Sequence, residues 1–266
     1  MSRLKRIVNT KATTRLYPEA RSYRNTPAGA KEAFLLCHGF TGTPRELSKV
    51  GDALAAMGIA SYAPRYPGHG TDRVDFYATG AEDWLRCAVD GYLDLRSEYE
   101  IVNLLGHSMG GLIATLVATS FNVPRLILLA PAFKVSNSAL PMSPALALVA
   151  PVIKRHRKNE ETDPLRKQLF EAYWSDDLVS QAAELRRLQK ATKRQLQRVH
   201  SKTLVVVGDK DETVPPQVAH YLEKRVLGAA SFESRSIAGV GHLFPFEQGS
   251  AEACSIIKDW VGKEVY

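Results

Sequence analysis

The 266-residue chain has only three cysteines and lacks any long apolar run. The cysteines, Cys37, Cys87 and Cys254, are odd in number and widely spaced, which favours free thiols in a reducing compartment over a disulfide framework or a zinc cage. No apolar run follows the early basic residues, and no stretch approaches the roughly 18 apolar residues of a membrane span. We therefore expect no secretory signal, no membrane span and a cytoplasmic location.

The net charge of +7 raises the question of a nucleic-acid partner. The positive charge is concentrated in residues 1–31 (+7) and 154–198 (+5), so the rest of the chain carries −5. Neither segment has the interleaved aromatic residues of a stacking platform, and we predict no nucleic-acid partner. The Lys-Arg-His-Arg-Lys run at 154–158 allows weak contact with an anionic membrane surface.

A nucleophile elbow is indicated at Gly106-His107-Ser108-Met109-Gly110. A predicted strand over 101–105 enters this turn, and an apolar helix predicted over 109–119 leaves it, which is the context that the G-x-S-x-G pattern requires. The pattern predicts a strained backbone at Ser108, with glycines two residues away on each side because side chains there would collide across the turn. The Ser108 hydroxyl is then presented at a helix N-terminus, where a developing anion is favoured.

Strands and helices alternate on both sides of this turn. Residues 33–37 form a continuous apolar run, typical of a strand buried on both faces, and a glycine loop and a helix follow it, with Thr43 as N-cap and Glu46 as its capping-box partner. Further strands are predicted over 19–24, 59–63, 125–130, 203–207 and 231–237, and further helices over 82–96, 216–226 and 248–261. This order predicts an α/β fold with a doubly wound, mostly parallel sheet and ligands at the carboxyl ends of its strands.

The segment from 131 to 199 breaks this alternation. It has no strand-like run, is too long for a loop, and contains helical or apolar stretches at 145–153, 164–174 and 178–196. We predict an α/β core made of residues 1–130 and 200–266, with residues 131–199 inserted as a helical cap whose apolar inner face lines the substrate pocket. A separate helical surface patch is the alternative.

A serine nucleophile needs a base to take its proton and an acid to orient that base. His242 lies in a glycine-flanked loop after the last predicted strand and is preferred as the base, whereas His38 and His69 suit structural hydrogen bonds and His107 is expected to point away from Ser108. For the acid, Asp209 and Asp211 compete. Asp211 lies further into the loop and is favoured, but the spacing leaves both open.

The oxyanion formed during attack needs two donors. The backbone N–H of Met109 follows the nucleophile, and the N–H of Phe40 lies in the loop after the first buried strand. Because histidines, cysteines and carboxylates are not clustered at ligand spacings, we expect no metal and no cofactor.

Over nearly its whole length the chain resembles the α/β-hydrolase fold family, and within it the bacterial carboxylesterase and monoacylglycerol lipase group. The resemblance is carried by the segments His38-Gly39-Phe40-Thr41-Gly42-Thr43-Pro44, Gly68-His69-Gly70-Thr71, Asp83-Trp84 and Asp211-Glu212-Thr213-Val214-Pro215-Pro216. It implies Ser108, Asp211 and His242 as the triad, Phe40 and Met109 as oxyanion donors, and the inserted segment as a cap. Residues 243–246 (Leu-Phe-Pro-Phe) depart from the group and predict a bulkier pocket mouth.

These features predict a serine carboxylic ester hydrolase acting on short- to medium-chain acyl esters of small molecules, through an acyl-enzyme. A monoacylglycerol lipase or lysophospholipase is the alternative, favoured by the apolar run at 145–153. An acyltransferase and a ligand-binding member with a vestigial triad are weaker alternatives. The physiological ester, the acyl length and the oligomeric state stay open.

Overall fold

A seven-stranded sheet forms the centre of the molecule. The computed structural model describes residues 16–153, 160, 162–171 and 178–263. The strands lie in the order β1-β3-β2-β4-β5-β6-β7, with β1 antiparallel to β3 and every other neighbouring pair parallel. Their bounds are β1 (Tyr23–Asn25), β2 (Glu32–Cys37), β3 (Ala60–Ala63), β4 (Ile101–His107), β5 (Arg125–Leu129), β6 (Lys202–Gly208) and β7 (Ser231–Ile237). The predicted doubly wound, mostly parallel sheet is confirmed.

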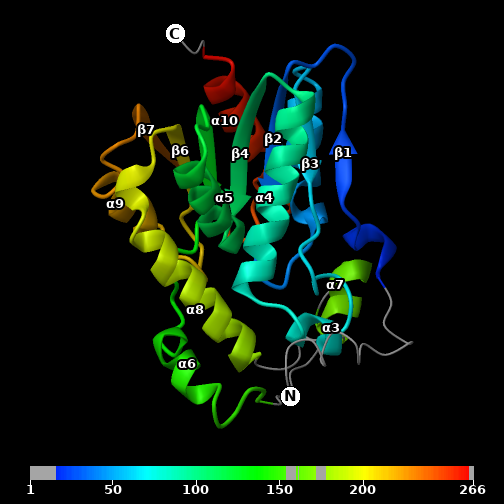
Figure 1. The fold of residues 1–266 in the computed structure, drawn as a ribbon, viewed down its shortest axis with the longest axis vertical. Helices are drawn as coiled ribbons and strands as arrows, with labels where there is room; N and C mark the ends of the chain where they lie inside the picture. Colours follow the sequence, from blue (N-terminus) through cyan, green and yellow to red (C-terminus); the bar gives the residue numbers. More distant parts are fainter. Residues whose placement is uncertain (1–15, 154–159, 161, 172–177, 264–266) are drawn as a thin grey trace.

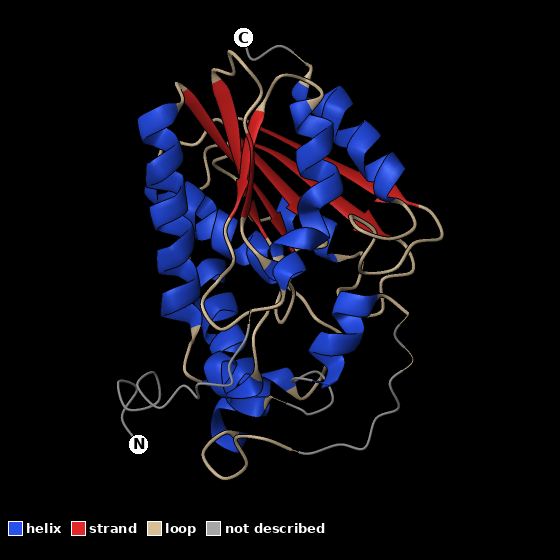
Figure 2. Ribbon diagram, turned by 90° about the vertical axis from the view of Figure 1, so that its right-hand side faces the viewer, coloured by secondary structure: helices blue, strands red, loops and turns tan. Residues whose placement is uncertain are grey.

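Helices cover both faces of this sheet (Figures 1 and 2). On one face lie α2 (Ser48–Ala55) and α10 (Ser250–Val261), and on the other lie α4 (Ala81–Glu98), α5 (Met109–Ser120), α8 (Val179–Lys193) and α9 (Val218–Glu223). Shorter elements are α3 (Arg73–Tyr77), α6 (Ser143–Leu146), α7 (Pro164–Leu169) and the 3-10 turns η1 (Pro18–Ala20), η2 (Pro44–Leu47), η3 (Leu140–Met142) and η5 (Leu196–Arg198). The two layers of helices explain why the central strands are apolar on both faces.

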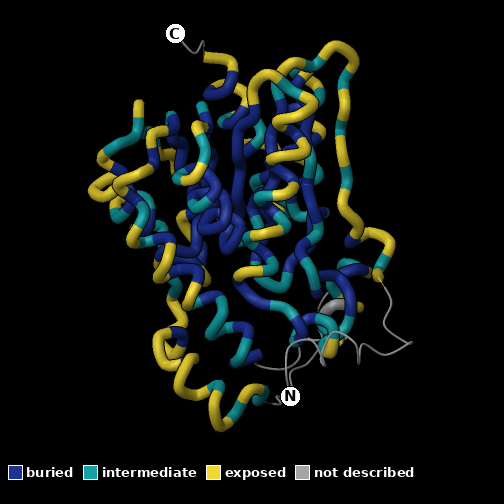
Figure 3. The backbone as a smooth tube through the Cα atoms, viewed as in Figure 1, coloured by how far each residue is buried: buried dark blue, intermediate teal, exposed yellow. Residues whose placement is uncertain are grey.

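The side chains of β2 alternate between two buried clusters. Leu35 and Cys37 join the cluster under α4 and α5, whereas Phe34 and Leu36 join the cluster under α2 and α10. All four side chains are fully buried, as expected for a central strand of a parallel sheet. Figure 3 shows the buried centre and the exposed outer surfaces of the helices. The prediction of a doubly buried strand over 33–37 is confirmed.

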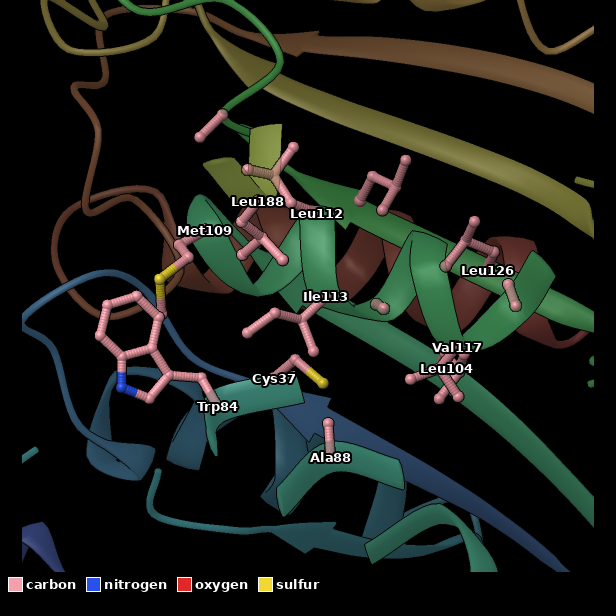
Figure 4. Close-up of a cluster of buried hydrophobic side chains, with 14 of the residues drawn as sticks. Cys37, Trp84, Ala88, Leu104, Met109, Leu112, Ile113, Val117, Leu126 and Leu188 are labelled. Atoms are coloured by element: carbon pink, nitrogen blue, oxygen red, sulfur yellow. The ribbon is translucent and has the colours of Figure 1, made fainter. Parts of the chain in front are cut away.

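Helix α5 is the most buried helix beside the sheet. Its side chains meet α4, β2 and α8 in one apolar cluster, in which Figure 4 labels Cys37, Trp84, Ala88, Leu104, Met109, Leu112, Ile113, Val117, Leu126 and Leu188. All ten are at most 3% exposed. Because burial of a large apolar side chain contributes about 1.5–3 kcal/mol, this packing holds the start of α5, and therefore the preceding turn, in a fixed place.

Helix α8 belongs to the segment between β5 and β6 and returns along the sheet toward the start of β6. The Thr192 hydroxyl lies 3.5 Å from the Leu112 carbonyl of α5, and the Gln189 amide donates to the Ala132 carbonyl at 2.7 Å. Leu185 and Leu188 are buried in the same cluster as α5. The helix predicted within 178–196 is confirmed, and it fastens the inserted segment to the core.

Two predictions near the N-terminus are wrong. The predicted strand over 19–24 is replaced by the 3-10 turn η1, which begins at a proline, and by the shorter strand β1. The predicted capping box before α2 does not form, because Thr43 makes no side-chain cap and the Glu46 carboxylate accepts instead from the Gly39 N–H at 3.2 Å. The chain passes through η2 before α2 begins at Ser48.

The inserted segment has shorter helices than its sequence suggests. The apolar run at 145–153 contributes only the end of α6, and Leu148 and Val149 are 86% and 81% exposed. Helix α7 ends at Leu169, while the predicted stretch extended to 174, into residues outside the described part of the chain. The basic run at 154–158 also lies outside the described residues.

Candidate active site

The turn at Ser108 joins β4 to α5. Ser108 has φ 52° and ψ −116°, so the predicted strain at this residue is confirmed. A methyl group at Gly106 would overlap the backbone of Gly110, as expected for an elbow. A methyl group at Gly110 would instead overlap the Cys37 carbonyl of β2, so this glycine is required by the neighbouring strand.

Backbone hydrogen bonds join this turn to the end of the neighbouring strand β5 and to the loop that follows it. The Ser108 N–H donates to the Leu129 carbonyl at 2.9 Å, and the Ser108 carbonyl accepts from Ala132 at 3.0 Å. The residue is 8% exposed. The unfavourable dihedral angles are therefore compensated by contacts with β5 and the loop that follows it.

The structure brings Ser108, His242 and Asp211 together. Nε2 of His242 lies 2.9 Å from the Ser108 hydroxyl, and Nδ1 lies 2.7 Å from Oδ2 of Asp211. Since a carboxylate only accepts, Nδ1 carries the proton and Nε2 is free to accept from Ser108. Burial is the main cause that lowers the pKa of His242 below its ordinary 6.5, against the opposing effect of Asp211. The imidazole is therefore neutral at pH 7.

Asp209 and Asp211 have different partners. One oxygen of Asp211 accepts from the N–H groups of Thr213 and Val214, both at 2.8 Å, which leaves the other oxygen aimed at His242. The Asp211 side chain is fully buried. Asp209 accepts from the Gly239 N–H at 2.7 Å and ties two loops together. Of the two acids, Asp211 is the one within hydrogen-bond distance of His242.

Phe40 and Met109 occupy the positions expected of oxyanion donors. Met109 is the first residue of α5, where backbone N–H groups have no partner within the helix. Phe40 lies in a turn closed by the Gly42 N–H to the Gly39 carbonyl at 3.2 Å, and its ring packs against Phe76 and Trp84. Phe40 thus follows β2 and Met109 follows β4, and these two strands are neighbours in the sheet.

His38 and His69 have structural partners, as predicted. Nε2 of His38 accepts from the Tyr66 N–H at 3.3 Å, and its Nδ1 lies 3.0 Å from the Gly39 carbonyl. Nδ1 of His69 lies 3.2 Å from the Pro67 carbonyl. Burial is the main cause that lowers the pKa of each to about 3, so both are neutral at pH 7.

Glu46 and His107 were not expected near the reacting groups. The ring of His107 is centred 4.9 Å from the His242 ring, and its Nε2 lies 3.0 Å from the His242 carbonyl. Oε2 of Glu46 lies 3.5 Å from Nδ1 of His107. His107 was expected to point away from Ser108, and nothing in its sequence position indicated contact with the His242 loop. Glu46 resembled an ordinary capping residue.

A small cavity adjoins Glu46, and neither Ser108 nor His242 is among its described lining residues. Its described lining residues are Thr43, Arg45, Glu46, Leu165, Arg166, Leu243 and Phe246. Leu243 and Phe246 belong to the bulky segment 243–246, while Phe244 is buried in the core, and the Phe246 ring lies 4.9 Å from the Arg45 guanidinium carbon. A larger cleft, of about 720 Å³, lies between α8 and residues 77–82, and Ser108 is not among its described lining residues.

The fold and this arrangement are those of an α/β hydrolase, and the chain belongs to the alpha/beta hydrolase family, whose model matches residues 34–254. It is 30% identical to a thermostable monoacylglycerol lipase of Bacillus sp. (strain H-257), over 72% of this chain and 74% of that protein. It is 42% identical to a carboxylesterase of Bacillus subtilis (strain 168), over 31% of this chain and 34% of that one. The chain is thus a hydrolase of the esterase and lipase type.

Solved structures show the same fold at lower sequence identity. A structure described with LipS and LipT, two metagenome-derived lipolytic enzymes, matches with a TM-score of 0.80 at 21% identity, covering 94% of this chain and all of that one. A monoacylglycerol lipase of Paleococcus ferrophilus matches with a TM-score of 0.70 at 18% identity, covering 91% and 98%. Among the helices that the structure describes, none is long and apolar enough to cross a membrane.

Proposed function

We propose that the protein is a carboxylic ester hydrolase that uses Ser108 as nucleophile, His242 as general base and acid, and Asp211 as the orienting group. The observation that carries this proposal is the continuous chain of contacts from Asp211 through His242 to Ser108, at 2.7 and 2.9 Å. These distances lie in the range in which a base takes the proton of a nucleophile.

The reaction follows from the protonation states at the site. Nε2 of His242 takes the hydroxyl proton as the Ser108 oxygen bonds to the ester carbonyl carbon, and the carbonyl oxygen becomes an anion. The buried Asp211 stabilises the imidazolium formed in this step. His242 then gives the proton to the departing alkoxide, which leaves as an alcohol. A water molecule, activated by the same nitrogen, hydrolyses the acyl-enzyme and restores Ser108.

The backbone N–H groups of Phe40 and Met109 are the proposed donors to the oxyanion. Met109 supplies an unpaired N–H and the positive end of α5, and Phe40 supplies an N–H from the turn after β2. Loss of one such donor typically lowers the rate about 100- to 1000-fold. The proposed reaction uses protein groups and water, and it requires no cofactor.

For the substrate, we propose short- to medium-chain acyl esters of small molecules, with residues 131–199 acting as a cap at the carboxyl ends of the strands. Support comes from α7, whose Leu165 lines the small cavity beside Glu46, and from Leu243 and Phe246, which narrow it. Bulky side chains at this position favour short acyl or alcohol groups over long chains.

Monoacylglycerol hydrolysis is the second candidate. It is favoured by the 30% identity to the thermostable monoacylglycerol lipase, which extends over 72% of this chain. The two candidates share the same chemistry at Ser108 and differ in the alcohol that leaves. A chain-length series of nitrophenyl esters, with monoacylglycerols as competitors, separates them. In a monoacylglycerol lipase, a monoacylglycerol near its KM competes for the active site and slows hydrolysis of the nitrophenyl ester.

The test of the catalytic assignment is Ser108→Ala, assayed with nitrophenyl acetate and butyrate. We expect a loss of about 10⁴-fold or more in kcat, because the nucleophile is removed. A fluorophosphonate probe should label Ser108 in the unmodified protein and leave the variant unlabelled. Retained activity in the variant would exclude Ser108 as nucleophile, and an unlabelled, inactive native protein would favour a ligand-binding role.

A further inference from the structure

Glu46 sits directly behind the turn that presents Phe40. Its side chain is only 17% exposed, and Oε2 accepts from the Gly39 N–H at 3.2 Å. A methyl group at Gly39 would lie 3.3 Å from this oxygen, 3.4 Å from Nδ1 of His107 and 3.5 Å from Cβ of Ser108. The carboxylate, the second imidazole and the nucleophile therefore meet around one glycine.

The two ring nitrogens of His107 face different groups. Nε2 lies 3.0 Å from the His242 carbonyl, which can only accept, so Nε2 carries a proton. Nδ1 faces the Glu46 carboxylate at 3.5 Å and is a buried atom without a hydrogen-bond partner. A lone pair on Nδ1 would be repelled by the carboxylate. The contact is favourable when Nδ1 carries a hydrogen, because the carboxylate then attracts it.

We propose that Glu46 and His107 form an ion pair that positions both halves of the active site, the Phe40 turn through Gly39 and the base through the His242 carbonyl. The Ser108 hydroxyl lies 2.9 Å from Nε2 of His242, so Glu46 and His107 are positioning residues. This inference rests on the proposed function, because it assigns a task to residues around the proposed triad.

The surroundings of Glu46 favour its charged form. Burial alone would raise the pKa of Glu46, but the contacts with His107, the nearby His38 and the Gly39 N–H together hold it below its ordinary value. The charged or titratable groups acting on His242 are Asp211, His107 and Glu46. His107 lowers the pKa of His242 and Glu46 raises it, so the two residues act on the base in opposite directions.

These opposite effects on the pKa of His242 give the proposal a measurable consequence. In His107→Gln, the glutamine amide can still donate to the His242 carbonyl, but its oxygen then faces Glu46, whose carboxylate keeps the Gly39 N–H and loses the imidazole. The unpaired carboxylate raises the pKa of His242, so the acid limb of the kcat/KM profile moves to higher pH. We also expect kcat to fall about 10- to 100-fold with little change in KM, because the reacting groups are misplaced.

The double variant Glu46→Gln with His107→Gln tests whether charge pairing is the cause. In this variant the Gly39 N–H can donate to the amide at position 46. That amide can donate to the amide at position 107, which donates to the His242 carbonyl, and no group in the series is charged. We expect the double variant to regain kcat relative to His107→Gln and to return the acid limb to its native position. It also contains no unpaired buried charge, so it remains folded if the single variant does not.

The measurement is kcat and KM for nitrophenyl acetate between pH 4.5 and 8.5, with folding checked by circular dichroism. The matched control is the exposed pair His220 and Glu223, 3.3 Å apart, changed to glutamine in the same way. A native acid limb in His107→Gln, or a double variant no more active than that single variant, would overturn the proposal. Activity that survives in Ser108→Ala would instead overturn the proposed function.

Discussion

The central strands and the segment between β5 and β6 use apolar residues in opposite ways. All five residues of β5 and six of the seven residues of β4 are buried, whereas Met142, Leu148 and Val149 in the inserted segment are 69%, 86% and 81% exposed. The strands end at the proposed reacting groups, while the segment lies beside them. We infer that the strands and their turns set the reaction, and that the segment affects access to the site.

The largest difference in stability is expected between two Gly→Ala changes. Gly110→Ala places a methyl group on the Cys37 carbonyl of β2, and neither backbone can move without shifting the sheet. We expect a loss of about 3 kcal/mol in the free energy of unfolding, measured with urea, which is the upper end of the usual cost of overpacking. Gly241→Ala is the control, since its nearest neighbour would be 3.9 Å away. A Gly110→Ala variant as stable as that control would contradict the close packing of β2 and α5.

Asp211→Asn and Asp209→Asn form a matched pair within the core. Asp211→Asn should lower kcat about 10⁴-fold, because an amide no longer holds the tautomer in which Nε2 of His242 accepts. Asp209→Asn retains an oxygen for the Gly239 N–H and should keep most of the activity. Steady-state kinetics with nitrophenyl butyrate measures both. The opposite result would transfer the orienting role to Asp209.

The pH dependence of kcat/KM tests the buried environment of the base. The pKa of His242 is lowered, mainly by burial, so the neutral form persists below pH 6.5. The base is inactive when protonated, and activity should therefore fall as the pH decreases, with a midpoint below 6.5 in the free enzyme. An acid limb centred above 6.5 would show that His242 is more accessible to water than this structure indicates.

The smallest effect is expected in the inserted segment. Leu148→Ser with Val149→Ser removes two highly exposed apolar side chains, so the free energy of unfolding should change by less than about 0.5 kcal/mol. Hydrolysis of nitrophenyl acetate should also stay unchanged. A larger loss of stability, measured by urea unfolding, would mean that these side chains are packed in solution and that the contrast between the two regions is weaker.

The sequence was most informative where a local pattern determines the structure. Apolar runs placed the central strands, and the glycines at 106 and 110 marked a turn in which side chains would overlap the backbone. The order of Ser108, Asp211 and His242, each after a strand, allowed their meeting at one sheet edge to be predicted. Their catalytic roles remain proposals, but their proximity is a consequence of the parallel sheet.

The sequence was least informative where a distant partner determines the direction of a side chain. Glu46 follows Thr43 by three residues, as in a capping box. Its carboxylate instead accepts from the Gly39 N–H and faces the ring of His107, beside the site. The choice between Asp209 and Asp211 was also left open by spacing alone. In the inserted segment, α6 and α7 are too short for helical periodicity to fix their ends.

The hydrogen bonds that hold Ser108 also constrain the order in which the site can form during synthesis. The partners of its backbone, the Leu129 carbonyl and the Ala132 N–H, lie 21 and 24 positions later in the chain. The carbonyl of Ala132 is in turn bound by Gln189, a further 57 positions on. A nascent chain that has just exposed Ser108 therefore lacks the contacts that stabilise a φ of 52°. The proposed nucleophile can form these contacts only after β5 and the loop that follows it have been translated.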